Sequence, residues 1–337
     1  MIDKLLRGTV HWHRESEFVW SRGRQLILGD LNGNHRKATV EFEFPIIAKL
    51  KWSTKLSQRL FRLQIKQVFE LGESTLGIVA FGAFYHLNLN EFKLQKVSEF
   101  PGPAPLRMCF DGENLIYGEY FTNKDRNPVN VFWSDDLGKS WRKQTTLTDI
   151  RHVHGVFHDS VEQKYWMTSG DLDHESHIRW SQDLFSTFET VHSGKQLHRI
   201  IEMLFLPDRI IYGTDTPYEQ NFIVEMDRAS RSLKNVQPVG GSIFFLRKTQ
   251  AGYFCSTAVE PSESNKSRDC EIWHSYNGSS WQLIKSFRKD FWSAHYFQFG
   301  RIQIPAGIGC RDGIWVSPIA ATNDGSSIFI DVDELSK

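Results

Sequence analysis

The sequence lacks long hydrophobic runs. Its N-terminal segment Met1–Arg7 is followed closely by His11, His13 and Arg14, so no apolar stretch of signal-peptide length is present. No other stretch approaches the ~20 apolar residues that a transmembrane helix needs. We therefore expect a cytoplasmic protein without a membrane partner.

An excess of charge of either sign is also missing. The 40 basic and 40 acidic side chains cancel to a formal net charge of zero, which gives no support to nucleic acid or an anionic membrane as a partner. Cysteine is scarce, and the four residues show neither C-x-x-C spacing nor the density of a disulfide scaffold. We expect most of them to be buried thiols. They are Cys109, Cys255, Cys270 and Cys310.

No long amphipathic helix is evident, whereas aromatic residues are abundant. The 337 residues include 11 Trp, 9 Tyr and 25 Phe. Aromatic side chains favour strands and fill the interfaces between packed sheets. The composition therefore indicates a large all-β protein.

The segment Ser134–Trp141, S-D-D-L-G-K-S-W, has the pattern S-x-D-x-G-x-[S/T]-W, which describes a tight hairpin turn. The Asp carboxylate can accept hydrogen bonds from backbone N–H groups, and Gly can take a positive φ without a steric penalty. The Ser hydroxyl and the Trp indole then attach the turn to neighbouring strands by hydrogen bonding and packing.

The motif recurs in altered form. Ser181–Phe188 keeps the Ser, Asp, Thr and an aromatic residue but has Phe in place of Gly, and its Ser follows Ser134 by 47 positions. Ser275–Trp281 keeps the Ser, an Asn-Gly turn and the Trp, and begins 94 positions after Ser181, twice that interval. A fixed interval of this length is typical of a radially repeated fold.

These three segments resemble the Asp-box, or BNR repeat, of sialidases, other Asp-box glycosidases and sortilin-like receptors. The resemblance implies an all-β, single-domain β-propeller of four-stranded antiparallel blades over residues 1–337, because a propeller must close its ring from end to end. Dividing 337 by 47 gives about seven blades, and the six blades of sialidases are the alternative. The resemblance does not extend to the sialidase catalytic residues, since neither the arginine triad nor a Tyr-Glu pair can be mapped.

Short apolar segments that contain small residues, in several cases followed by an acidic residue, also recur along the chain. Small residues suit the innermost strand of a blade, where backbones crowd, so we predict that these segments line a central pit. They are Leu26–Asp30, Leu76–Phe81, Leu115–Glu119, Tyr165–Asp171, Ile210–Asp215, Tyr253–Thr257 and Gly313–Ser317.

Acidic residues follow four of these segments and are expected to meet at the rim of the pit. Glycoside hydrolysis needs two carboxyl groups that flank the scissile bond. Asp171 and Asp215 are the best pair, with Glu119, Glu219 and Glu260 as alternates. The competing interpretation of each residue is a turn cap, because Asp and Glu are frequent in turns.

His152 and His154 would project from the same face of a strand, because side chains alternate in direction along it. Such a pair suits a metal site, a proton-transfer pair or a sugar-binding floor, and the competing interpretation is two core histidines. Without a third ligand at a diagnostic spacing, the sequence assigns no metal site. His154 is a candidate acid or base, with Tyr218 as its partner in a β-elimination.

Basic side chains complete the predicted pocket. Guanidinium groups bind carboxylates in bidentate fashion, so arginines would hold an acidic sugar. The predicted substrate-binding residues are Arg151, His152, Arg199, Asn221, Glu260, His295 and Arg301.

Together these features predict a carbohydrate-active enzyme, either a glycoside hydrolase or a polysaccharide lyase, that acts on an acidic oligosaccharide or polysaccharide. A non-catalytic glycan- or protein-binding propeller is one alternative, and a sugar epimerase is another. No cofactor is predicted, although carboxylates and histidines leave a divalent cation open.

Overall fold

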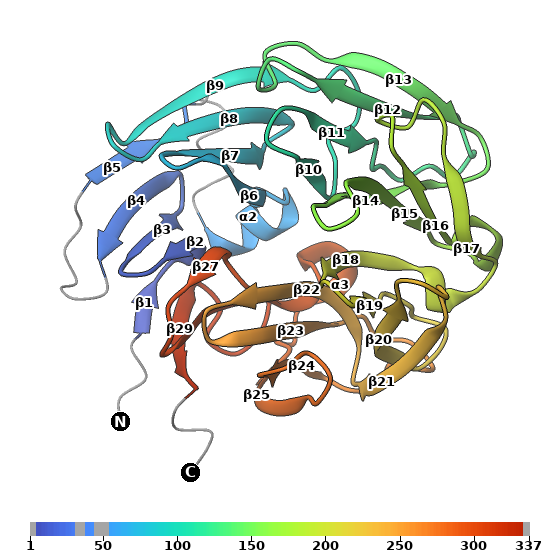
Figure 1. The fold of residues 1–337 in the computed structure, drawn as a ribbon. Helices are drawn as coiled ribbons and strands as arrows, with labels where there is room; N and C mark the ends of the chain where they lie inside the picture. Colours follow the sequence, from blue (N-terminus) through green and yellow to red (C-terminus); the bar gives the residue numbers. More distant parts are fainter. Residues whose placement is uncertain (1–4, 31–37, 44–53, 333–337) are drawn as a thin grey trace.

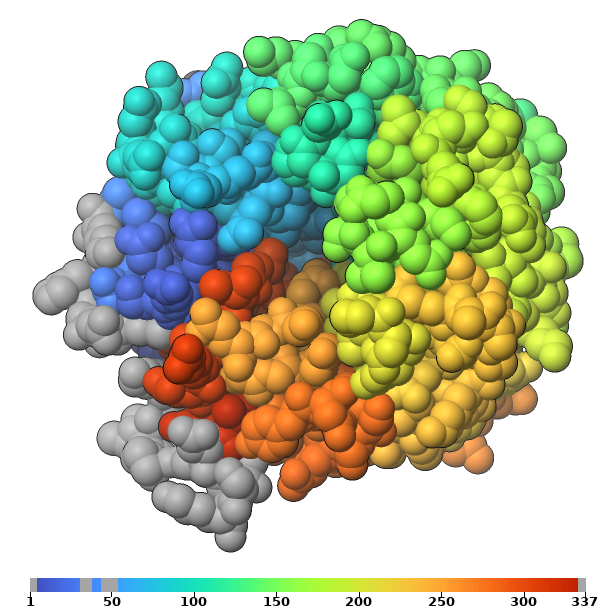
Figure 2. All heavy atoms as spheres, viewed as in Figure 1, coloured from blue at the N-terminus to red at the C-terminus, as the bar shows by residue number. Residues whose placement is uncertain are grey.

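The computed structural model describes residues 5–30, 38–43 and 54–332. Their strands form sheets arranged as blades around a central axis, with both ends of the described chain on the same side of the ring (Figure 1). In the space-filling view, successive parts of the sequence follow one another around this face (Figure 2). The predicted all-β propeller arrangement is confirmed.

Five separate sheets have four or five strands each. The first consists of β2 (Thr9–Arg14), β3 (Glu17–Arg22), β4 (Gln25–Asp30) and β5 (Ala38–Glu41), with β27 (Ala306–Gly309) parallel to β2. The second consists of β6 (Ile65–Gly72), β7 (Thr75–Ala80), β8 (Ala83–Asn88) and β9 (Lys93–Glu99). The third consists of β10 (Met108–Phe110), β11 (Leu115–Gly118), β12 (Val129–Ser134) and β13 (Arg142–Leu147). The fourth consists of β14 (His152–Asp159), β15 (Lys164–Gly170), β16 (His177–Ser181) and β17 (Glu189–Ser193). The fifth consists of β18 (Ile200–Phe205), β19 (Arg209–Thr214), β20 (Asn221–Asp227) and β21 (Leu233–Val239).

A sixth, eight-stranded sheet completes the ring. Its strands are β22 (Ser242–Thr249), β23 (Gly252–Val259), β24 (Asp269–Ser275), β25 (Gln282–Arg288), β26 (Gly300–Gln303), β28 (Gly313–Ile319), β29 (Ser326–Asp331) and β1 (Leu5–Arg7). β26 pairs with β23 on one side and with β28 on the other, and β1 pairs with β29. The chain therefore closes its ring by placing an N-terminal strand beside a C-terminal one.

The prediction of seven blades, with six as the alternative, was wrong, because the described residues form five separate blades. Five sheets are separate, and the remaining strands share one sheet. The pairing of Ala258 with Arg301 and of Val259 with Gly300 joins β23 to β26. A sequence interval counts groups of strands, but it carries no information about whether two neighbouring groups pair.

The assignment of the innermost strands was also wrong. The first strands β10, β14, β18 and β22 lie nearest the axis (Figure 1), whereas the predicted segments correspond to second strands such as β11, β15, β19 and β23. These second strands contain small residues because the next blade packs closely against them. A Cβ atom at Gly118 would lie 2.4 Å from Cγ2 of Val153, and one at Gly213 would lie 2.3 Å from Cγ2 of Ile243.

The turn at Ser134–Trp141 makes the hydrogen bonds expected of it. Oδ1 of Asp136 accepts from the Ser134 hydroxyl at 2.7 Å and from the Ser140 N–H at 3.0 Å. Gly138 has φ +81° and donates its N–H to Ser134 Oγ. The Trp141 indole donates to Ser98 of the preceding sheet at 3.0 Å, so the turn ties two blades together.

The related turns keep this arrangement. Asp183 accepts from the Ser181 hydroxyl and from the Thr187 N–H, at 2.7 and 2.9 Å. Gly278 donates its N–H to Ser275 Oγ at 2.8 Å. Phe185 takes φ +69° in place of the missing glycine, so the surrounding contacts outweigh its conformational preference.

Few helices interrupt the strands. In the described residues they are α2 (Lys55–Leu60), α3 (Ala294–Phe297) and the 3-10 turns Asp173–Glu175 and Gln196–His198. α2 and the end of α3 are joined by the Arg59 Nε–H, which donates to the Phe297 carbonyl at 2.7 Å. None of the helices in the described part of the chain has the length and apolar character needed to cross a membrane.

Removal of the Asp136 carboxylate should destabilise the fold more than removal of its neighbour. Asp136→Ala leaves the Ser134 and Ser140 donors without their acceptor, and we expect a loss of about 1–3 kcal/mol in the free energy of unfolding. Asp135 is exposed, and its one ion pair among the described residues is with Arg142, so Asp135→Ala should cost less than about 1 kcal/mol. Urea unfolding of both variants provides the measurement, and equal losses would contradict this account of the turn.

Candidate functional site

Three side chains from two adjacent strands converge beside the axis. His152 and His154 lie on β14, and their Nε2 atoms are 3.2 Å apart. Asp171 directly follows β15, and its Oδ1 lies 3.5 Å from both of these nitrogens. The two imidazoles are almost completely buried. The structure thus supplies the third group that sequence spacing did not indicate.

The outer nitrogens of both imidazoles face backbone carbonyls. His152 Nδ1 lies 2.8 Å from the Phe121 carbonyl, and His154 Nδ1 lies 3.2 Å from the Ile200 carbonyl. A carbonyl can only accept, so each Nδ1 carries a hydrogen, and the Nε2 atom of each ring faces Asp171, where it is an acceptor whenever the ring is neutral. Burial lowers the pKa of His154 to about 4. Three acceptor atoms therefore meet at one point, an arrangement that requires a proton or a metal ion between them.

Two arginines hold the Asp171 carboxylate in place. Arg151 Nη1 lies 2.5 Å from Oδ2, and Arg199 Nη2 lies 3.1 Å from Oδ1. Burial opposes ionisation of Asp171, but the positive charge of Arg199 outweighs burial and holds the pKa of this carboxyl far below the usual range. The buried Nε of Arg151 has no hydrogen-bond partner among the described residues.

A second carboxyl lies on the other side of Arg199. Asp215 follows β19, and its Oδ2 lies 3.3 Å from Arg199 Nε. Burial raises the pKa of Asp215 to about 7, against the attraction of Arg199 and with the help of the nearby Glu260 charge. Burial also raises the pKa of Glu260, whose Oε2 is 3.3 Å from the Ser242 hydroxyl. Arg199 therefore lies between an ionised carboxylate and a carboxyl group that titrates near neutrality.

An aromatic side chain completes the cluster. The Tyr120 ring centroid lies 4.5 Å from that of His152, and burial raises the pKa of its hydroxyl to about 12, so the phenol stays neutral. Tyr120 and Ser242 were not among the predicted site residues. Ser242 begins β22 as His152 begins β14, so attention to the first residue of each innermost strand could have found it.

Seven predicted residues are thus brought together, and six are not. The seven are Arg151, His152, His154, Asp171, Arg199, Asp215 and Glu260. The six are Glu119, Tyr218, Glu219, Asn221, His295 and Arg301. The roles assigned to all thirteen remain predictions.

Physical reasons account for the different placement of these six. The Glu119 carboxylate accepts from the N–H and side-chain amide of Asn130, at 2.8 and 3.1 Å. The side-chain amide of Asn221 donates a hydrogen bond to the Thr216 carbonyl in the preceding loop. Arg301 donates to Gln64. The remaining three are exposed, and they are Tyr218, Glu219 and His295.

Comparison with solved structures shows that the fold is shared with known β-propellers. An oligogalacturonate lyase from Vibrio parahaemolyticus has a TM-score of 0.58 and 8% identity, with 99% of this chain and 93% of that one covered. An oligogalacturonate lyase in complex with manganese has a TM-score of 0.55 and 9% identity, with 99% and 92% covered. The N-terminal domain of Nup159 has a TM-score of 0.51 and 10% identity, with 96% and 90% covered.

At these low sequence identities, the structural similarity shows a common fold but does not show a common activity. No protein-family model matches the chain, and no curated protein sequence does. The Asp-box resemblance is not shown by these comparisons and stays a prediction.

The raised pKa of Asp215 predicts a pH-dependent stability. A carboxyl whose pKa is higher in the folded state stabilises the fold at low pH, and this contribution is lost as pH rises through about 7. Asp215→Asn should therefore gain stability relative to wild type between about pH 5 and pH 8, on the order of 2 kcal/mol. Urea unfolding at both pH values measures the difference, with the exposed Asp208→Asn as the control. A difference that does not vary with pH would contradict the placement of this proton.

Proposed function

We propose that the chain is a carbohydrate-active enzyme that cleaves an acidic, uronate-containing oligosaccharide by β-elimination. The observation that carries the proposal is the position of Arg199 between the ionised Asp171 and Asp215, whose carboxyl titrates near neutrality. The likeness to two structures solved as oligogalacturonate lyases adds support.

β-Elimination removes the proton from C5 of a uronate and breaks the bond between C4 and the linking oxygen. The C5 proton becomes acidic only when the adjacent carboxylate is neutralised. Arg151 has a buried Nε without a partner among the described residues. Arg199 contacts the same Asp171 carboxylate as Arg151 does. A substrate carboxylate is the group whose charge and geometry suit these donors.

The proton transfers require a base and an acid with pKa values near the working pH. In this proposal the Glu260 carboxylate takes the C5 proton, and Asp215 gives its proton to the departing oxygen. Oδ1 of Asp215 is buried without a partner among the described residues, as a donor reserved for substrate would be. The neutral Tyr120 hydroxyl can hydrogen-bond a sugar. Tyr218 has no part in the proposal because its side chain is exposed.

The histidine pair and Asp171 suit a divalent cation. Their donor atoms all lie within 4.8 Å of one another, and a backbone carbonyl orients each imidazole, as is usual around bound metals. When bound, such an ion would polarise the substrate carboxylate. The manganese in one of the similar structures is consistent with this assignment.

Hydrolysis is the second candidate. The opposite pKa shifts of Asp171 and Asp215 are the arrangement that glycosidases use for an ionised and a protonated carboxyl. Product mass separates the two reactions, because hydrolysis adds one water and elimination adds none.

Incubation with trigalacturonate should yield products whose summed mass equals that of the substrate, together with the ultraviolet absorbance of an unsaturated uronate. Asp215→Asn should lower kcat by at least about 100-fold because the leaving group loses its proton donor, with Asp208→Asn unchanged. A gain of water would favour the hydrolase, and an isomer of unchanged mass would favour an epimerase. Binding of a glycan without any product would support the binding module instead.

Metal binding tests the role of the histidine pair. We expect isothermal titration with Mn²⁺ to show one site in the wild type and none in His154→Ala or Asp171→Asn, because each variant removes one of three ligands. His158→Ala removes a histidine from the same strand outside the cluster and should bind normally. Equal binding by all four proteins would contradict the assignment.

A further inference from the structure

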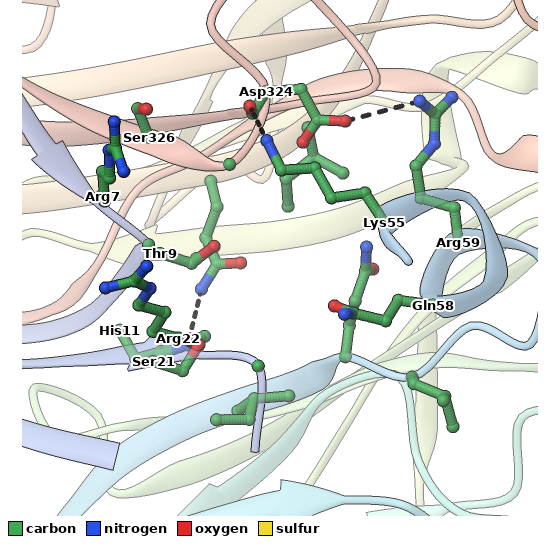
Figure 3. Close-up of a pocket in the computed structure, with 18 of the residues that line it drawn as sticks. Arg7, Thr9, His11, Ser21, Arg22, Lys55, Gln58, Arg59, Asp324 and Ser326 are labelled. Atoms are coloured by element: carbon green, nitrogen blue, oxygen red, sulfur yellow. Dashed lines mark hydrogen bonds and ion pairs between the residues drawn. The ribbon is translucent and has the colours of Figure 1, made fainter. Parts of the chain in front are cut away.

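A cavity of about 520 Å³ is formed where the first sheet, the eight-stranded sheet and α2 meet. Its walls come from β1, β2, β3, α2 and the turn before β29 (Figure 3). It shares no residue with the candidate active site. The volume is in the range of pockets that bind small molecules.

Cationic side chains line this cavity from two sides. Arg7 and Arg22 lie on one side, with Lys55 and Arg59 opposite (Figure 3). Arg59 is neutralised, because its Nη1 lies 2.5 Å from the Asp290 carboxylate and 3.4 Å from that of Asp324.

The other three cations form no ion pair among the described residues, although the Asp324 carboxylate, which also lines the cavity, attracts Lys55. Lys55 donates to the backbone carbonyl of Asp324 at 2.8 Å and forms no ion pair within 4.0 Å among the described residues. Neither Arg7 nor Arg22 is paired with a carboxylate in the described ranges 5–30, 38–43 and 54–332. The cavity therefore has a net positive lining.

A chain of hydrogen bonds directs a further donor toward the cavity. The Gln303 amide donates to His11 Nδ1 at 2.9 Å, so His11 carries its hydrogen on Nε2 and donates it to Ser21 Oγ at 2.7 Å. Burial lowers the pKa of His11 to about 3, which keeps the ring neutral. With its oxygen engaged as an acceptor, the Ser21 hydroxyl has its own hydrogen available for a ligand.

We propose that this cavity binds a small phosphorylated sugar or a similar hydroxylated phosphomonoester. Arg7, Arg22 and Lys55 match the charge of the phosphate, and the Ser21 hydroxyl donates to one of its oxygens. The hydroxyl of Thr9, which also lines the cavity, is suited to a sugar hydroxyl. The proposal goes beyond the proposed elimination and does not depend on it.

Isothermal titration with glucose 6-phosphate, inorganic phosphate and glucose tests the inference. The wild type should bind glucose 6-phosphate at least about 10-fold more tightly than either of the others, because only this ligand meets both the cations and the polar walls. Equal binding of inorganic phosphate would overturn the proposal for a sugar phosphate, and equal binding of glucose would overturn the role of the cations.

Variants locate the site. Arg22→Ala and Ser21→Ala should each weaken glucose 6-phosphate binding by about 10-fold, the loss of one charge-assisted or neutral hydrogen bond. Arg24→Ala removes a nearby arginine that pairs with Glu41 outside the cavity and should bind as the wild type does. His154→Ala should also bind normally, which distinguishes this site from the candidate active site. Unchanged binding in both Arg22→Ala and Ser21→Ala would overturn the proposal.

Discussion

The candidate active site depends on the absence of a side chain at Gly170, the last residue of β15. A Cβ atom there would lie 2.7 Å from Cε1 of His154 and 2.9 Å from Cγ of Arg199. The first strands of two blades can therefore bring these side chains against the end of β15, where Asp171 emerges between them. The same close approach at Gly118 and Gly213 joins other blades. At Gly170 alone, among these three, the neighbours are ionisable groups.

Burial then separates the behaviour of the carboxyls that this packing collects. Asp171 contacts two arginines and two histidines and stays ionised, whereas Asp215 contacts one arginine and is more deeply buried. The Arg199 guanidinium contacts both of these carboxyl groups. Differences in solvent access and in the number of charged partners thus lower the pKa of one aspartate and raise that of the other, although the two side chains are identical.

Periodicity accounts for what could be predicted from the sequence. Asp171, Asp215 and Glu260 each follow a second strand, so a repeat places them on one rim, and alternation along β14 places His152 beside His154. Glu119 occupies the equivalent position after β11, yet its carboxylate turns to Asn130 on the adjacent strand. Periodicity specifies where a residue emerges, and the direction of its side chain depends on partners that spacing does not identify.

Contacts between segments that are far apart in the sequence could not be predicted either, because residue spacing does not identify pairing partners. The pairing of β23 with β26 merges strands that the repeat counts separately, and the cationic cavity combines β1, α2 and the turn before β29 from opposite ends of the chain. The turn at Phe185 is the opposite case, because its structure is kept although its sequence motif is incomplete. Its sequence lacks the expected glycine, but the turn hydrogen bonds of Ser181 and Asp183 persist.

The central claim is that Arg199 lies between an aspartate that is ionised and one that titrates near neutrality. Carboxyl ¹³C NMR of protein labelled at aspartate would observe this directly. The account predicts one aspartate resonance that titrates near pH 7 in the wild type and is missing from Asp215→Asn. A spectrum in which every aspartate is already ionised at about pH 5, or in which the high-pH titration persists in Asp215→Asn, would contradict it.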